Sequence, residues 1–224
     1  MKSTKLAVAL LAAMGLSAVV TPAMAYEAGD WLIRGRIINV NPNDSSGNVK
    51  VNGAAVAGSG VTVDDDTVPE IDITYMIAPH WGVELILGYS EHDVDASGTV
   101  SGLGKVIQAK ALPPTLTLQY HFMPNSNYRP YVGAGVNYTY FWDEDVKGPL
   151  NGPGAKVDMD DSWGLAVQAG IDIAINEDWF VNLDVKYLDM STTAKFKNTS
   201  AAQRVEVDVD IDPVIWGIGI GRRF

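Results

Sequence analysis

The chain has 224 residues, of which 27 are acidic and 16 basic, and its formal net charge is −11. A chain this acidic lacks the basic surface that phosphate backbones require, so we expect no nucleic acid among its partners. It contains no cysteine, which excludes a disulfide-stapled secreted fold.

The first 25 residues have the pattern of an export signal. Two lysines precede an apolar run that ends at Val20, and the small-residue sequence Ala-Met-Ala follows. The run is shorter than the roughly 20 residues that a membrane helix requires, which disfavours the alternative of a transmembrane anchor. We therefore predict a cleaved signal peptide over 1–25, cleavage between Ala25 and Tyr26, and one mature domain over 26–224.

After this signal, large apolar side chains recur at every second position, as from Trp81 to Tyr89. Such alternation predicts strands that have one apolar face and one mixed face. In chain order, the predicted strands cover residues 30–40, 68–77, 81–91, 108–122, 129–142, 162–175, 179–196 and 205–224.

The connections between these strands alternate in length. The short ones are 78–80, 123–128 and 176–178, and the long ones are 41–67, 92–107, 143–161 and 197–204. Short periplasmic turns, long extracellular loops and an even strand number are typical of outer-membrane barrels. We therefore predict an all-β fold, an eight-stranded antiparallel transmembrane β-barrel in the bacterial outer membrane. Both termini are expected in the periplasm, and the lipid of that membrane is an expected partner.

The aromatic residues form two groups on this strand map. The group at the predicted periplasmic ends comprises Trp31, Trp81, Tyr120, Phe122, Tyr128, Trp179 and Phe224. The group toward the outer ends comprises Tyr89, Tyr138, Tyr140, Trp142, Trp163 and Tyr187. Because amphipathic rings prefer membrane interfaces, these groups predict two aromatic girdles. The terminal Phe224 on an alternating strand also looks like the signal that the barrel-assembly machinery reads, although Arg222 departs from that signal.

Several stretches of the mature chain form a familiar series. They are Tyr26–Trp31, Gly82–Leu85, Leu112–Leu116, Arg129–Tyr138, Asp161–Gly164, Asp212–Pro213 and Arg223–Phe224. Together they resemble the OmpW family of small outer-membrane β-barrel proteins, over nearly the whole mature chain except the long loops. The resemblance implies an eight-stranded barrel with a narrow, largely apolar lumen. It also implies passage of small hydrophobic molecules, or, as in some members, a receptor for bacteriocins or phage.

When the apolar faces are turned toward lipid, a set of charged side chains points into the lumen. The predicted charged plug comprises Arg34, Arg36, Glu70, Asp72, Glu84, Asp184, Lys186 and Arg223, and Asp172 shares their parity. Charges in a narrow lumen must be paired to be tolerated. The pattern therefore indicates either a barrier to water and ions or a network that simply fills the core.

Nearer the predicted outer rim, the inward positions are apolar. The predicted lumen pocket comprises Ile38, Val40, Ile86, Leu188, Met190 and Ile215, whose other interpretation is ordinary interior packing. Pro113 and Pro114 fall inside the fourth strand, where each removes a ladder donor. They indicate either a lateral seam or a bulge. At Pro213 the apolar parity of the last strand switches, and there we predict a bulge.

The sequence gives no sign of catalysis. His80, His92 and His121 have no metal-ligand spacing, the acidic loop clusters lack the EF-hand pattern, and nucleophile-elbow, P-loop and dinucleotide motifs are missing. We expect no enzyme, no metal and no cofactor. Three functions remain. They are a passive outer-membrane conduit for small hydrophobic molecules, a structural, adhesive or receptor barrel acting through its acidic loops, and a soluble lipocalin-like carrier.

Overall fold

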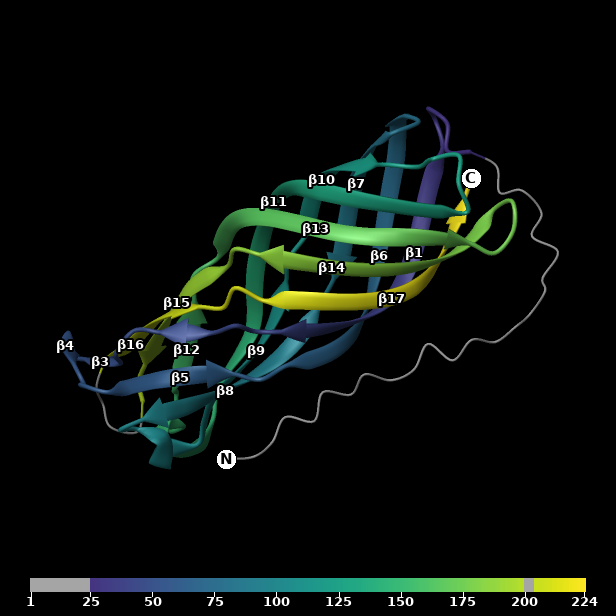
Figure 1. Ribbon diagram of the computed structural model, residues 1–224. Coiled ribbons are helices and arrows are strands. Elements are labelled where there is room, and N and C mark those ends of the chain that lie inside the picture. Colours follow the sequence, from purple (N-terminus) through teal and green to yellow (C-terminus); the bar gives the residue numbers. More distant parts are fainter. Residues whose placement is uncertain (1–24, 200–203) are drawn as a thin grey trace, which may run out of the picture.

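The barrel is a closed ring of antiparallel strands, drawn out along one axis (Figure 1). The computed structural model describes residues 25–199 and 204–224, so the predicted signal peptide lies outside the described residues except for Ala25. The eight strands of the ring are, in order, β1 (Trp31–Asn41), β6 (Asp66–Ala78), β7 (Trp81–Gly88), β10 (Thr115–His121), β11 (Tyr128–Val146), β13 (Ser162–Ala174), β14 (Trp179–Leu188) and β17 (Val214–Arg223).

The ring closes because every one of these strands pairs with two neighbours. β10 pairs with both β7 and β11, and β1 pairs with both β6 and β17. Ring order follows chain order throughout, so each strand lies beside the one before it. The predicted eight-stranded antiparallel barrel is thereby confirmed. No helix in the part of the chain that the structure describes is long and apolar enough to cross a membrane.

The two ends of the barrel differ. Three short connections, 79–80, 122–127 and 175–178, and the C-terminus lie at one end, which we call the turn end. At the other, the loop end, the sheet continues beyond the ring as shorter strands (Figure 1). These are β2 (Ser45–Ser46), β3 (Lys50–Val51), β4 (Ala54–Ala55), β5 (Ser59–Val63), β8 (Ser90–Gly98), β9 (Lys105–Leu112), β12 (Lys156–Met159), β15 (Ser191–Lys197) and β16 (Val205–Asp210), with the one-turn helices η1 (Ser101–Leu103) and η2 (Gly148–Leu150).

The regions that we expected to be long loops are thus partly strand. β8 and β9 pair across most of 92–107, and β5 extends the same sheet from within 41–67. Their alternation is carried by small valines and alanines between Asp, Lys, Gly and Thr, which gives a weak apolar signal. Sequence alternation finds the strands in the barrel wall more readily, because large side chains mark their apolar face.

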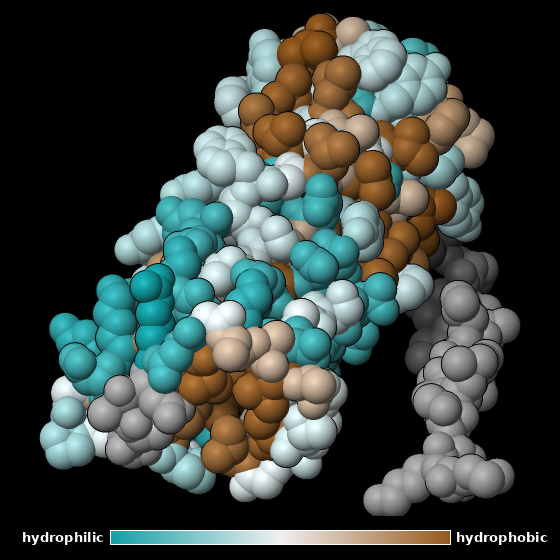
Figure 2. All heavy atoms as spheres, turned by 90° about the vertical axis from the view of Figure 1, so that its left-hand side faces the viewer, coloured by the Kyte–Doolittle hydropathy of each residue, from teal (hydrophilic) through white to brown (hydrophobic). Residues whose placement is uncertain are grey.

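The apolar face is reversed between the two halves of the molecule. On the barrel wall Ile37, Val167 and Ile218 point outward, with 55%, 51% and 58% of their surfaces exposed. In the loop-end extension Val94 and Val207 are buried inside, while lysines and aspartates point out. Figure 2 shows apolar side chains over the wall, a polar zone beside them and a second, smaller apolar area toward the loop end. The wall therefore suits lipid and the extension suits water.

This reversal explains why the bulge predicted at Pro213 is wrong. The residues on both sides of Pro213 keep one register with the neighbouring chain, since Val214 faces Asn41 and Val209 faces Ser46. No extra residue is inserted, and the buried residues stay on one parity through the connection. The surroundings change at this point and the side-chain direction does not.

Aromatic rings gather at two levels of the wall. Near the turn end the rings of Trp81 and Tyr120 lie 5.0 Å apart, and that of Phe122 lies 5.2 Å from Tyr120. Toward the loop end Tyr138 and Trp163 lie 4.7 Å apart, and 75% of the Trp163 surface is exposed. The two groups mark the two borders of the apolar wall, which is where amphipathic rings are stable in a bilayer.

Candidate functional site in the barrel lumen

Arg34 on β1 occupies the centre of the lower lumen and is completely buried. Its Nη1 lies 3.2 Å from Oε1 of Glu84, and its Nη2 lies 2.8 Å from Oδ2 of Asp172. Nη1 also donates a hydrogen bond of 2.7 Å to the Thr74 hydroxyl. Because Glu84 belongs to β7 and Asp172 to β13, one guanidinium ties two sides of the barrel together.

Arg36, two residues after Arg34 on β1 and nearer the loop end, forms a second set of ion pairs. It pairs with Asp72, and its Nε and Nη1 lie 3.0 Å from Glu70 Oε1 and 3.2 Å from Asp184 Oδ1. Lys186 adds a pair of 2.6 Å to the same Glu70 oxygen. We define the charged cluster as Arg34, Arg36, Glu70, Asp72, Glu84, Asp172, Asp184 and Lys186, all of which are buried.

Neutral polar side chains complete the cluster, and sequence reasoning missed them. Gln119 and Gln168 each donate to Oε2 of Glu84, at 2.8 and 2.7 Å, and the Tyr131 hydroxyl donates to Asp184 at 2.8 Å. Their inward parity was visible in the sequence, but a glutamine or tyrosine gives no charge signal. These bonds occupy carboxylate oxygens that the arginines leave free, which is what buried ionised groups require.

The turn end of the lumen is closed by Tyr26, the first residue after the predicted cleavage site. Only 1% of its surface is exposed, and its hydroxyl donates a hydrogen bond of 3.0 Å to Asp172. Its ring lies 4.1 Å from the guanidinium carbon of Arg129 and 5.4 Å from the His121 ring. The segment before β1 thus folds back into the barrel mouth, a contact that no sequence pattern marks.

Arg223 points to this same mouth and does not join the charged cluster. Its Nη1 lies 3.7 Å from Asp30, its Nη2 lies 3.8 Å from Asp178, and it also donates to the Ala25 carbonyl. It differs from the predicted plug position because the last strand carries it below Arg34, to the level of the turns. If the chain is cut after Ala25, the two aspartates remain as its partners.

Replacing Tyr26 with phenylalanine is expected to lower the free energy of unfolding by about 1.5–3 kcal/mol, the usual contribution of a hydrogen bond to a charged group. The reason is that Asp172 loses the hydroxyl at 3.0 Å. Urea unfolding of the barrel in phospholipid vesicles measures this. Tyr128→Phe is the matched control, because that ring is 58% exposed, and it should leave the midpoint unchanged. Equal midpoints for all three proteins would show that Tyr26 does not close the barrel mouth through this bond.

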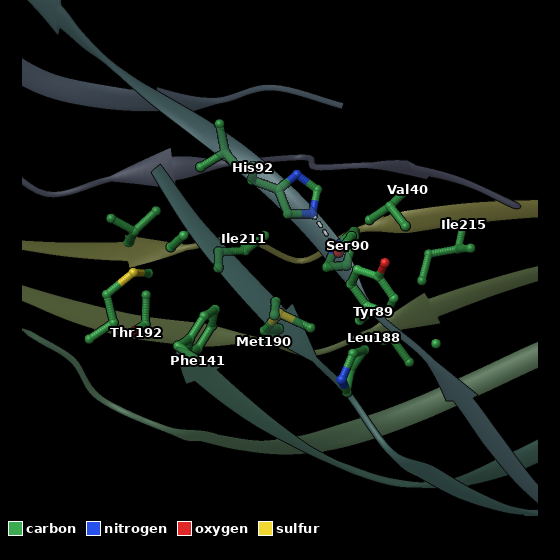
Figure 3. A pocket seen from close by; sticks show the side chains of 18 of the residues that line it. Val40, Tyr89, Ser90, His92, Phe141, Leu188, Met190, Thr192, Ile211 and Ile215 are labelled. Atoms are coloured by element: carbon green, nitrogen blue, oxygen red, sulfur yellow. Dashed lines mark hydrogen bonds between the residues drawn. The ribbon is translucent and has the colours of Figure 1, made fainter. Parts of the chain in front are cut away.

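Above the charged cluster the lumen widens into an apolar cavity of about 60 Å³. All of the residues predicted for the lumen pocket line it: Ile38, Val40, Ile86, Leu188, Met190 and Ile215. Side chains toward the loop end continue its wall, including Val94 and Val207. Phe141 lies on the same wall (Figure 3). Glu70 and Lys186 of the charged cluster also line it, so the cavity ends where the ion pairs begin. Its volume is room for about four to six water-sized groups.

The wall of this cavity contains an interrupted stretch of ladder. β10 pairs with β7 as far as Thr115 opposite Ile86, and pairing resumes where Ala111 of β9 faces Ser90 of β8. Within the described part of the chain, no backbone hydrogen bond joins 87–89 to 112–114. We call this stretch the gap.

The gap lies on one side of the two prolines only. On the other side the Tyr138 N–H donates 3.1 Å to the Pro114 carbonyl, and pairing with β11 resumes at Leu112. The register is the same above and below the prolines, so the structure contains no bulge at this point. Because alternate residues of a strand bond to opposite neighbours, the donor missing at Pro113 is the one that would face Gly88. Gly88, Tyr89 and Pro113 line the apolar cavity, which therefore reaches the gap.

Some of the acidic residues outside the barrel are paired with lysines across neighbouring strands. Lys197 lies 2.6 Å from Asp158, and Lys195 lies 2.5 Å from Asp160. The hydrogen bond from Lys50 lowers the pKa of the Asp208 carboxyl. The described residues contain no group of three or more His, Asp or Glu that would hold a metal ion.

Comparison with known proteins finds relatives that match nearly the whole length of the chain. A model of the OmpW family matches residues 27–224. Outer membrane protein W of Vibrio cholerae is 36% identical, with 100% of both chains covered. Dibenzothiophene metabolism operon protein PahQ of Pseudomonas aeruginosa is 33% identical over 93% of this chain and 95% of its own. Among solved structures, the outer membrane protein OprG of Pseudomonas aeruginosa has a TM-score of 0.85 at 42% identity, covering 90% of this chain and 99% of that one. The outer membrane protein AlkL has a TM-score of 0.66 at 26% identity, covering 91% and 94%.

A closed antiparallel ring with an apolar outer wall, and relatives of this kind, define an outer-membrane β-barrel protein embedded in the lipid bilayer. The chain belongs to the OmpW family and crosses the bacterial outer membrane several times. The relatives named above are barrel proteins and do not bear the names of enzymes. The soluble carrier considered from the sequence is therefore excluded.

Replacing Val167 with arginine is expected to reduce the stability of the folded barrel in phospholipid vesicles by about 2–4 kcal/mol, as for cations placed in the middle of a lipid-facing wall. Val167 is 51% exposed on that wall. Thr62→Arg, on the exposed face of the loop-end strand β5, is the control and should fold like the unchanged protein. A Val167 variant that unfolds at the same urea concentration as this control would contradict the position of the bilayer.

Proposed function

We propose that this protein is a passive conduit for small hydrophobic molecules across the outer membrane. A solute enters from the loop end, occupies the apolar cavity above the charged cluster, and leaves through the gap into the bilayer. No cofactor or energy source takes part, and no catalytic step is involved. The observation that carries the proposal is the cavity itself, which is apolar on its walls, ion-paired at its base and bordered by the gap.

The charged cluster would act as a plug because of what passage through it requires. An apolar solute moving straight down the lumen would have to part ion pairs such as Arg36–Glu70 and leave buried charges uncompensated. Sideways movement through the gap brings the same solute into hydrocarbon, where its apolar surface stays out of water. Water and ions are held back by the same network, so an open aqueous pore is not expected.

The relatives support this proposal. PahQ is named for an operon of dibenzothiophene metabolism, and dibenzothiophene is a small, apolar aromatic compound. At 33% identity over nearly the whole of both chains, the two proteins share the barrel and not only a motif. We further propose that Phe224, which is 61% exposed at the end of β17, is the residue that the barrel-assembly machinery reads.

Uptake of toluene by intact cells tests the proposal, with glycerol as the polar comparison. Cells that make the protein should take up toluene severalfold faster than cells that lack it, and glycerol uptake should be the same in both. Equal toluene uptake would overturn the conduit and favour the alternative, a structural or receptor barrel that acts through its outer surface.

A further inference from the structure

One wall of the apolar cavity carries a polar pair, Ser90 and His92. Both lie on β8, two residues apart, so their side chains share the face that points into the cavity (Figure 3). Ser90 is only 5% exposed, and its Oγ lies 2.8 Å from Nε2 of His92. A buried hydroxyl in a cavity lined by valine, isoleucine and leucine is costly to keep there unless it has partners.

The direction of this hydrogen bond follows from a second contact of His92. Its Nδ1 lies 2.7 Å from the main-chain carbonyl oxygen of Asp64. Because a carbonyl oxygen only accepts, Nδ1 must carry the hydrogen of the neutral ring, and Nε2 is then an acceptor. The Ser90 hydroxyl therefore donates to His92. Its hydrogen is taken, and the lone pairs of Oγ are left facing the cavity.

Several other polar side chains on the cavity wall are already engaged. Lys186 is paired with Glu70 at 2.6 Å, and the Thr192 hydroxyl donates to the Asp160 carbonyl at 2.7 Å. For Ser90 Oγ, the described residues provide no donor that would use its lone pairs. It is thus an acceptor without a donor, in a space that is otherwise apolar.

We propose that Ser90 is a hydrogen-bond acceptor subsite that binds the hydroxyl group of a small apolar alcohol or phenol. The proposal rests on the conduit function and names the class of solute that the cavity prefers. Ser90 faces Ala111 directly above the gap, so a solute held by its hydroxyl lies beside the lateral exit. A solute whose polar group only accepts gains nothing from this subsite, because the serine hydrogen is held by His92.

Three probes of nearly equal size separate these cases: phenol, which donates; toluene, which is apolar; and benzaldehyde, which only accepts. The barrel is prepared in lipid nanodiscs with methyl-labelled methionine, and the Met190 signal reports binding because Met190 lines the cavity. Met76, buried in a separate cluster, is the internal reference. Phenol is expected to bind about three- to tenfold more tightly than toluene, the effect of one hydrogen bond, and benzaldehyde no more tightly than toluene.

The variant His92→Phe removes the acceptor that holds the serine hydrogen. Ser90 can then donate, so benzaldehyde affinity should rise severalfold relative to toluene. The double variant Ser90→Ala with His92→Phe should bind all three probes alike. Thr192→Val, which removes another hydroxyl from the same wall, should keep the preference for phenol.

The outcomes separate the subsite from the conduit. If the unchanged protein binds all three probes equally, or if His92→Phe shifts all three affinities by one factor, the pair only fastens the Asp64 segment to β8 and the subsite is wrong. Toluene binding would then still support the conduit. If none of the probes moves the Met190 signal, both the subsite and the conduit are overturned.

Discussion

Replacing Arg36 with alanine is expected to destabilise the folded barrel by about 3–5 kcal/mol, the cost of removing one partner from a buried ion pair. The guanidinium pairs with Glu70, Asp72 and Asp184 and also lies 4.0 Å from Glu84, and its own side chain is completely buried. Without it, the first three of these carboxylates are left with Lys186 as the nearby cation, 2.6 Å from Glu70 and 3.9 Å from Asp184. Tryptophan fluorescence during urea unfolding in phospholipid vesicles measures the loss.

Arg204→Ala is the matched control for this variant. Arg204 pairs with Glu206 on the outer surface of the loop-end extension, where its side chain is 74% exposed. Exposed ion pairs contribute little, so the urea midpoint should not move. An Arg36 variant as stable as the control would show that the cluster does not hold the lower lumen closed, and the plug would lose its physical basis.

Replacing Pro113 with valine is expected to reduce toluene uptake by at least about tenfold. Valine restores the N–H that faces Gly88 and allows two ladder hydrogen bonds across the gap, each contributing about 1 kcal/mol to the closed wall. Every 1.4 kcal/mol is a factor of ten in an equilibrium, so two bonds suffice. Rates of toluene uptake in cells, normalised to the amount of folded barrel, measure the effect.

Pro114→Val provides the control because the two prolines face different neighbours. Pro114 bonds toward β11 through its carbonyl, at 3.1 Å from the Tyr138 N–H, so a new N–H there strengthens a side that is already joined. Uptake should stay at the level of the unchanged protein. If both variants transport normally, the solute does not leave between β7 and β10. If both lose transport equally, the prolines act by shaping the wall as a whole.

The fold was predictable from the sequence because large apolar residues alternate on the barrel wall. The stretch from Trp81 to Tyr89 is enough to place β7, and the odd–even sorting of its neighbours places Arg34 and Glu84 in the lumen. The alternation does not reveal whether lipid or water surrounds a strand on its outer side. Before Pro213, in the stretch Val205–Ile211, the inward positions hold apolar residues because the outside is water there, and this made one continuous register look like a switch of face.

The parts of the site that escaped prediction depend on contacts that have no local pattern. The sequence marks Tyr26 as the first mature residue and as part of a family motif, but its hydroxyl contact with Asp172, 146 positions away, has no local signal. The sequence shows only that His92 lacks metal-ligand spacing, whereas in the structure its partners are a backbone carbonyl and a serine. Such contacts arise when distant strands close into a ring, and alternation in one strand does not contain that information.

A reversible disulfide across the gap tests the central claim, lateral exit of the solute, most directly. The chain has no cysteine, so Tyr89→Cys with Leu112→Cys introduces one pair on the outer face of the gap, at positions that lie opposite each other in the shared register. The control pair, Val132→Cys with Ala169→Cys, joins β11 to β13, which are already hydrogen-bonded. Oxidation should stop toluene uptake through the first barrel, reduction should restore it, and the control should transport in both states. Uptake through the oxidised Cys pair at the gap equal to that after reduction would contradict the account.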